Sequence, residues 1–236
     1  MLRAGAKMAV NSALYALPAA ARNRFKRYHE LRYWRGVTRP IRNDRAGLEH
    51  ERAHYEHFFT VFFGLTRADY AGKRLLDIGC GPCGSLEWAA CARERVGLDP
   101  LAGEYAKLAR DDQKMTYCAA PSEAIPFGDG HFDSVTAFNC LDHVDDVDAT
   151  VREIKRVAAP RGRVLLIVET GHAPTPTEPH RLDESIALKF APEFEAVSAR
   201  IFGVRADHNL YASLLDEVPF VPGRPGIFCA RLERKN

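Results

Sequence analysis

Beyond residue 73 the chain alternates short apolar runs with segments of helical periodicity. This alternation is typical of βαβ units, in which buried strands form a parallel sheet and amphipathic helices cover it. The predicted strands cover residues 74–78, 95–98, 115–118, 132–138, 163–169, 194–202 and 227–232. The predicted helices cover residues 85–92, 101–110, 147–158 and 183–190. The last two strands read as an antiparallel hairpin, and the long segment between them predicts a helix or a functional role.

The residues before this region follow a different pattern. Residues 11–34 are helical in periodicity but interrupted at Pro18, a loop is expected around residues 36–44, and a second helix over residues 48–63. We therefore expect two parts. Residues 1–70 form an N-terminal helical extension that acts as a lid, and residues 71–236 form the α/β domain.

The amino-acid composition indicates a globular protein but does not identify a binding partner. The 236 residues are 46% hydrophobic and 27% charged, as in an ordinary globular protein, and carry a net charge of +2. Residues 1–45 hold eleven Lys or Arg and two acids, which suits phosphate, nucleic acid, an anionic membrane surface or a solvated helix face. Six scattered cysteines indicate reduced thiols and a cytoplasmic protein. The apolar runs are shorter than the roughly 18 residues that span a bilayer.

Residues 77–84, Asp-Ile-Gly-Cys-Gly-Pro-Cys-Gly, lie where the first predicted strand passes to the first predicted helix. Glycines at such a turn let a ligand approach the main chain. The spacing of Gly79, Gly81 and Gly84 matches a dinucleotide fingerprint, but the carboxylate of Asp77 would repel a pyrophosphate. The Cys-Gly-Pro-Cys within the loop spells a thioredoxin-like redox motif, although the long preceding extension is unlike that fold.

A third interpretation rests on several motifs in order. The first strand ends in Asp-Ile-Gly-Cys-Gly, and Asp99 and Pro100 follow the second strand about 20 residues later. This resembles the glycine-rich first motif and the ribose-binding acid of the class I S-adenosylmethionine-dependent methyltransferases. Residues 122–133, 139–144 and 152–163 resemble later motifs of the same family. Pro121 departs from the pattern, because many members have an acid there that could bond the adenine amino group.

The resemblance, which covers residues 73–169, implies a Rossmann-like three-layer sandwich. Its seven-stranded sheet is mostly parallel with an antiparallel last strand. It also implies S-adenosyl-L-methionine as cofactor and S-adenosyl-L-homocysteine as product. Asp77 suits the cationic amino-acid end of that cofactor, and Asp99 is placed to accept both ribose hydroxyls. The expected cofactor-binding residues are Asp77, Gly79, Cys80, Gly81, Asp99, Pro100, Ser122, Glu123 and Asn139.

Candidate bases can be named, although methyl transfer from a sulfonium requires alignment more than a catalytic signature. A base helps when the nucleophile is a hydroxyl or a protonated amine. We expect His143, beside Asp142 after the fourth strand, to be this base, with His180 after the fifth strand as a second candidate. No metal site is expected. Three histidines of the second N-terminal helix share a face but extend over roughly 10 Å along it, too far for all three to bind one ion.

These expectations favour a small-molecule methyltransferase of the class I type. The acceptor would be methylated at O, N or C and would be a natural-product or sugar intermediate. One alternative is RNA methylation through the basic N-terminal segment. The lack of a recognisable RNA-binding module argues against it. Another is a non-catalytic cofactor-binding subunit. A homodimer and weak contact of the N-terminal segment with a membrane surface are left open.

Overall fold

A computed structural model describes residues 18–41, 44–108 and 113–235. Its centre is one seven-stranded sheet in the order β3-β2-β1-β4-β5-β7-β6. The strands are β1 (Arg74–Ile78), β2 (Glu94–Leu98), β3 (Thr116–Cys118), β4 (Phe132–Phe138), β5 (Ala158–Thr170), β6 (Phe194–Gly203) and β7 (Gly226–Arg234). β1 to β5 pair in parallel, whereas β7 is antiparallel to both β5 and β6. The predicted sheet and its antiparallel last strand are confirmed.

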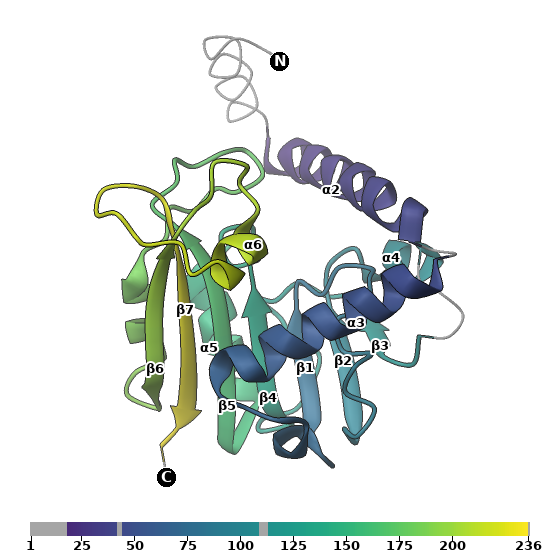
Figure 1. Ribbon diagram of the computed structural model, residues 1–236, viewed down its shortest axis with the longest axis vertical. Helices are drawn as coiled ribbons and strands as arrows, with labels where there is room; N and C mark the ends of the chain where they lie inside the picture. Colours follow the sequence, from purple (N-terminus) through teal and green to yellow (C-terminus); the bar gives the residue numbers. More distant parts are fainter. Residues whose placement is uncertain (1–17, 42–43, 109–112, 236) are drawn as a thin grey trace.

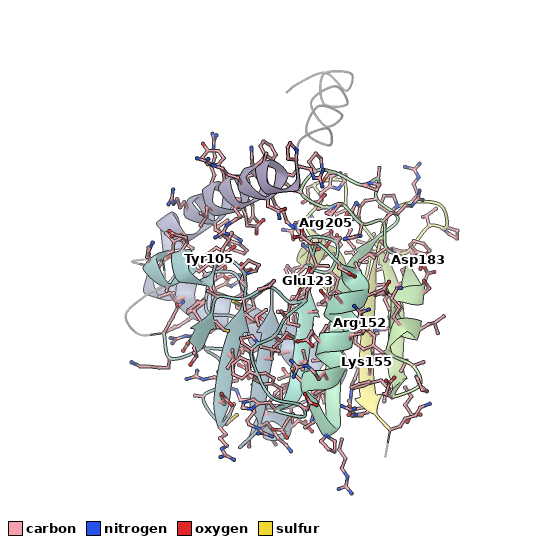
Figure 2. The ribbon with its side chains drawn as sticks, turned by 180° about the vertical axis from the view of Figure 1, so that it is seen from behind. Tyr105, Glu123, Arg152, Lys155, Asp183 and Arg205 are labelled. Carbon is pink, nitrogen blue, oxygen red and sulfur yellow. The ribbon has the colours of Figure 1, made fainter. Side chains whose placement is uncertain are left out.

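Helices cover both faces of this sheet, so the three-layer arrangement is confirmed (Figures 1 and 2). The helices are α2 (Ala19–Ile41), α3 (Arg45–Phe59), α4 (Ala102–Leu108), α5 (Val147–Val157) and α6 (Leu210–Leu215), with the short 3-10 helices η1 (Val61–Phe63), η2 (Arg67–Tyr70) and η3 (Glu184–Phe190). α6 supplies the helix expected between the last two strands. Among the described residues, no helix combines the length and the apolar character needed to cross a membrane.

Side chains of β5 alternate between two hydrophobic cores, as the pleat of a strand covered on both faces requires. Val164 and Leu166 pack with residues of α5 and η3. Leu165 and Ile167 pack with residues of α3, η1, η2 and α6. Phe58 of α3 is 1% exposed in this second core, so α3 is built into the body of the domain.

The first described helix is longer than the sequence predicts. A loop was expected from Gly36, but α2 continues to Ile41. Thr38 is buried, and its hydroxyl donates to the Trp34 carbonyl one turn earlier in the same helix, so the burial of Thr38 outweighs the poor helix propensity of Gly36. α2 lies across the carboxyl ends of the parallel strands (Figure 1). The part of the extension before Pro18 lies outside the described residues.

The helix predicted over residues 85–92 is wrong. This segment is a series of turns, with the Glu87 and Ala89 amides donating to carbonyls three residues earlier. Leu86, Trp88 and Ala89 are buried, and the Glu87 carboxylate turns inward to accept the Met115 amide at 2.7 Å. A regular helix turns successive side chains by 100° and cannot bury four in a row against one surface. Tertiary contacts therefore decide the local conformation.

Candidate cofactor and acceptor site

The glycine loop after β1 requires glycine at two positions. Gly79 has φ +71°, and a Cβ there would lie 2.5 Å from the Cβ of Cys140. Gly81 has φ +56°, and its Cβ would lie 2.8 Å from the Trp34 ring of α2. Positive φ combined with such close approach excludes other side chains. β1 and β4 are neighbours at the point where the strand order reverses, which is where open α/β sheets bind ligands.

Asp77 stands at the end of β1, just before this loop, and is buried. Its carboxylate accepts hydrogen bonds from the hydroxyls of Thr136, at 2.6 Å, and of Ser85. Burial raises the pKa of Asp77 to about 6, and the two hydroxyls oppose this rise. The group is therefore a fixed anion at pH 7 and above, as expected for a partner of a cationic ligand end.

Asp99 follows β2 and faces the same edge of the sheet. Its Oδ1 accepts the Leu101 amide at 2.7 Å. Burial, with the nearby charge of Glu30 on α2, raises the pKa of Asp99 to about 7. Below α2, on α4, Tyr105 is fully buried and its hydroxyl has no hydrogen-bond partner among the described residues (Figure 2).

Helix α2 contributes a stripe of side chains that the sequence interpretation did not assign to the site. Lys26, Glu30 and Trp34 recur at i, i+4 and i+8, so they share one face of the helix. Trp34 donates its indole N–H to Glu30 at 2.8 Å and lies over the glycine loop. Lys26 donates to the backbone carbonyl of His143. The i, i+4 spacing was the available signal for this face.

The predicted adenine-loop residues make structural contacts with their side chains. Ser122 is buried, and its hydroxyl lies 2.9 Å from that of Thr150 on α5. Glu123 accepts the amides of Asp145 and Asp146 at 2.7 and 3.0 Å. A cofactor role for Ser122 and Glu123 through their backbone, and for the exposed Pro100, stays a prediction.

Asn139 adopts the left-handed backbone conformation, which Asn tolerates better than most residues. Its φ is +49°, and its buried Oδ1 has no partner among the described residues. The unpartnered oxygens of Asn139 and Tyr105 lie after β4 and β2, on either side of the glycine loop. Buried polar atoms are normally hydrogen-bonded, so a polar ligand at this edge, such as the nucleoside end of the expected cofactor, fits the residues present.

The thioredoxin-like interpretation of the loop finds no support in the thiols. Cys80 and Cys83 are both free. Burial raises the pKa of Cys80 well above its usual value and that of Cys83 to about 12, whereas a redox-active thiol needs a lowered pKa. A helix N-terminus can lower the pKa of a thiol, but residues 85–92 form turns rather than a helix.

The predicted bases come together on the loops after β4 and β5. His143 Nε2 lies 3.9 Å from Oδ2 of the buried Asp142. His180 Nε2 lies 2.9 Å from the Val144 carbonyl. Because a carbonyl only accepts, this nitrogen carries a hydrogen, and in the neutral ring Nδ1 is then the acceptor.

A third histidine joins this group and was missed in the sequence. His172, directly after β5, has Nε2 3.4 Å from Asp142 Oδ2 and Nδ1 3.1 Å from the Ala173 carbonyl. The nearby Asp142 carboxylate raises the pKa of His172 to about 9, so at neutral pH its ring is a cation rather than a base. Only its position after a parallel strand could have signalled it.

The fold and this site define a class I S-adenosylmethionine-dependent methyltransferase domain, with a glycine loop and two acids at the carboxyl edge. Residues 76–166 match the family described as a methyltransferase domain. This part of the chain therefore resembles an S-adenosylmethionine-dependent methyltransferase domain, and the resemblance implies S-adenosyl-L-methionine as the cofactor.

Three known proteins illustrate the similarity. Norajmaline N-methyltransferase of Rauvolfia serpentina is 30% identical over 155 residues, which cover 61% of this chain and 51% of that protein. The chloroplastic tocopherol O-methyltransferase of Arabidopsis thaliana is 34% identical over 104 residues, covering 40% and 30%. The crystal structure of an S-adenosylmethionine-dependent methyltransferase from Mesorhizobium loti matches this chain with a TM-score of 0.53 and 19% sequence identity. The match covers 70% of this chain and 93% of the Mesorhizobium loti chain, and it supports the fold. The chain spans about half the length of these curated relatives, or less.

The buried acid at the loop predicts a pH-dependent stability for the ligand-free protein. Unfolded Asp77 ionises near pH 3.8 and folded Asp77 near pH 6, so its contribution to stability falls across this window by up to roughly 3 kcal/mol. Asp77→Asn keeps an oxygen acceptor and removes the charge. In urea unfolding, this variant should gain stability relative to the wild type at about pH 8 and much less at about pH 4. The same change at both pH values would contradict the assignment.

Proposed function

We propose that this protein transfers the methyl group of S-adenosyl-L-methionine to the O, N or C atom of a small-molecule acceptor, such as a natural-product or sugar intermediate. One observation carries the proposal. The glycine loop and Asp99 share the carboxyl edge of the sheet with the histidine-bearing loops after β4 and β5. The relatives named above methylate N and O by their names.

The reaction needs little from the protein beyond alignment. An acceptor lone pair attacks the methyl carbon in line with the departing sulfur, whose bonding electrons stay on it as an uncharged thioether. Where the acceptor loses a proton, His143 or His180 takes it, because both imidazoles border the edge beyond the glycine loop. Asp77 faces the amino-acid end of the cofactor and Asp99 its ribose, and α2 excludes water from above the loop.

The histidines provide the test of this chemistry. The acceptor is first found by following S-adenosyl-L-homocysteine release with a panel of phenols, amines and sugars. With that acceptor, replacing the proton-accepting residue, as His143→Gln or His180→Gln, should lower kcat roughly 100-fold or more. Cofactor affinity should not change in calorimetry. The matched control is His50→Gln, on the exposed surface of α3.

Other outcomes would change the proposal. If neither histidine variant loses activity, the role of both as bases is wrong. Cofactor binding without turnover of any acceptor would favour a non-catalytic subunit, and turnover only with added RNA would favour the RNA alternative. The proposed cytoplasmic location agrees with six free cysteines. The homodimer and the membrane contact stay predictions.

A further inference from the structure

The loops after β4 and β5 bring together several side chains, and some of them have no role in the proposed methyl transfer. One ligand atom each from Asp142, His143 and Glu178 lies within 4.8 Å of the other two. These atoms are two carboxylate oxygens and one imidazole nitrogen. The three residues come from two different strand ends, so the tertiary fold, rather than local sequence, brings them together.

One carboxylate oxygen of Asp142 is available to a ligand. Its Oδ2 faces His172 at 3.4 Å and His143 at 3.9 Å. Its Oδ1 is buried and has no hydrogen-bond partner among the described residues, and the side chain is 2% exposed. A buried carboxylate oxygen without a partner is costly. The site therefore presents an unsatisfied anionic acceptor.

Glu178 is held ready by its own loop. Its Oε2 accepts the Thr175 hydroxyl at 3.1 Å, and its amide donates to the same hydroxyl at 3.0 Å. This short turn fixes the carboxylate opposite Asp142 and His143. Glu169, at the end of β5, lies within electrostatic reach of Asp142 and Glu178. The carboxylates of Asp142, Glu169 and Glu178 thus gather at one place.

We propose that Asp142, His143 and Glu178 bind a divalent transition-metal ion of the Mn²⁺ or Zn²⁺ class. Such ions take nitrogen from imidazole and oxygen from carboxylates, at about 2.0–2.2 Å for zinc. Ligand atoms within 4.8 Å of one another reach a common ion after small side-chain rotations. The imidazole decides against Mg²⁺ and Ca²⁺, which prefer sets made only of oxygen.

The metal site also narrows the chemical class of the methyl acceptor. This inference rests on the proposed function. Three protein ligands leave positions open, and a hydroxyl oxygen of the acceptor fills one. A bound ion would lower the pKa of that hydroxyl, so that its proton would pass more readily to water. His143 then acts as a metal ligand, and the substrate class is a phenol or another hydroxyl-bearing molecule rather than an amine.

Binding of Mn²⁺ alone tests the site without any acceptor. Protein stripped with a chelator is titrated with Mn²⁺, and free ion is measured by electron paramagnetic resonance, because Mn²⁺ has little affinity for the six thiols. We expect one ion per chain. Glu178→Gln and Asp142→Asn should each weaken binding at least about tenfold. Asp145→Asn, in the same loop but with a side chain that is 65% exposed, should leave it unchanged.

Three results would overturn the metal site: no binding of Mn²⁺ or Zn²⁺ at millimolar concentration, equal affinity in Glu178→Gln, or equal loss in Asp145→Asn. Glu178→Gln serves as the second variant if the buried Asp142→Asn fails to fold. Cofactor binding by calorimetry is measured on the same samples. If the metal fails to bind while the cofactor binds and methyl transfer persists, only the metal site is wrong; loss of both cofactor binding and methyl transfer would refute the proposed function.

Discussion

Gly79→Ala should destabilise the protein by about 3 kcal/mol, measured as the free energy of unfolding in urea. A side chain at positive φ costs roughly 1–2 kcal/mol, and overpacking adds about 1–3 kcal/mol. Both apply here, because φ is +71° and the new Cβ would lie 2.5 Å from the Cβ of Cys140. The loop must then move, so cofactor affinity should fall as well.

Two other glycines separate these causes. Gly64 also has positive φ, at +68°, but nothing lies within 4 Å of its Cβ position, so Gly64→Ala isolates the backbone cost. Gly128 has neither positive φ nor a neighbour within 4 Å, so Gly128→Ala should be nearly neutral. A loss in Gly79→Ala no larger than in Gly64→Ala would show that the contact with Cys140 does not limit this position.

Asp99→Ala should weaken binding of S-adenosyl-L-methionine roughly tenfold or more in calorimetry. The substitution removes a charged acceptor, and hydrogen bonds to charged groups contribute about 1.5–3 kcal/mol. Because burial raises the pKa of Asp99 to about 7, wild-type affinity should also rise between about pH 6 and pH 8, and Asp99→Ala should abolish the part of this rise that Asp99 causes.

The matched control for Asp99 lies at the other end of the same strand. Glu94 begins β2 and pairs with His131 at 2.8 Å, far from the carboxyl edge. Glu94→Ala should therefore leave cofactor affinity unchanged. Unchanged affinity in Asp99→Ala would refute the ribose-binding role, and an equal loss in both variants would point to a general effect on β2.

Several parts of the site could be predicted because their signal is local. The glycines at 79 and 81 are needed by the backbone itself, and Asp77 and Asp99 end apolar runs that can only be buried strands. Parallel strands bring their carboxyl ends to one edge, so the positions of these acids followed from the order of the strands. His143 and His180 were predicted on the same ground, and the structure places both on the loops at that edge.

Other parts depended on contacts that no local pattern carries. The segment 85–92 has the composition of a helix, yet it buries Leu86 and Trp88 against one surface and becomes a series of turns. α2 runs past Gly36 because Thr38 is buried and the Trp34 ring packs over the glycine loop. His172 has no motif around it and acquires its charge from Asp142, thirty positions earlier.

The sequence by itself indicated the class of protein through a parallel sheet, a glycine turn and the two acids that are predicted to bind the cofactor. Each of these features has a signal in the nearby sequence: the periodicity of a strand, or a residue type that a tight turn requires. Only the tertiary structure showed which side chains gather on the acceptor side of the predicted site. The stripe on α2 and the group formed by Asp142, His143, His172 and Glu178 depend on distances between segments far apart in the chain. Those distances are set by packing across the whole domain, which periodicity along the chain does not encode.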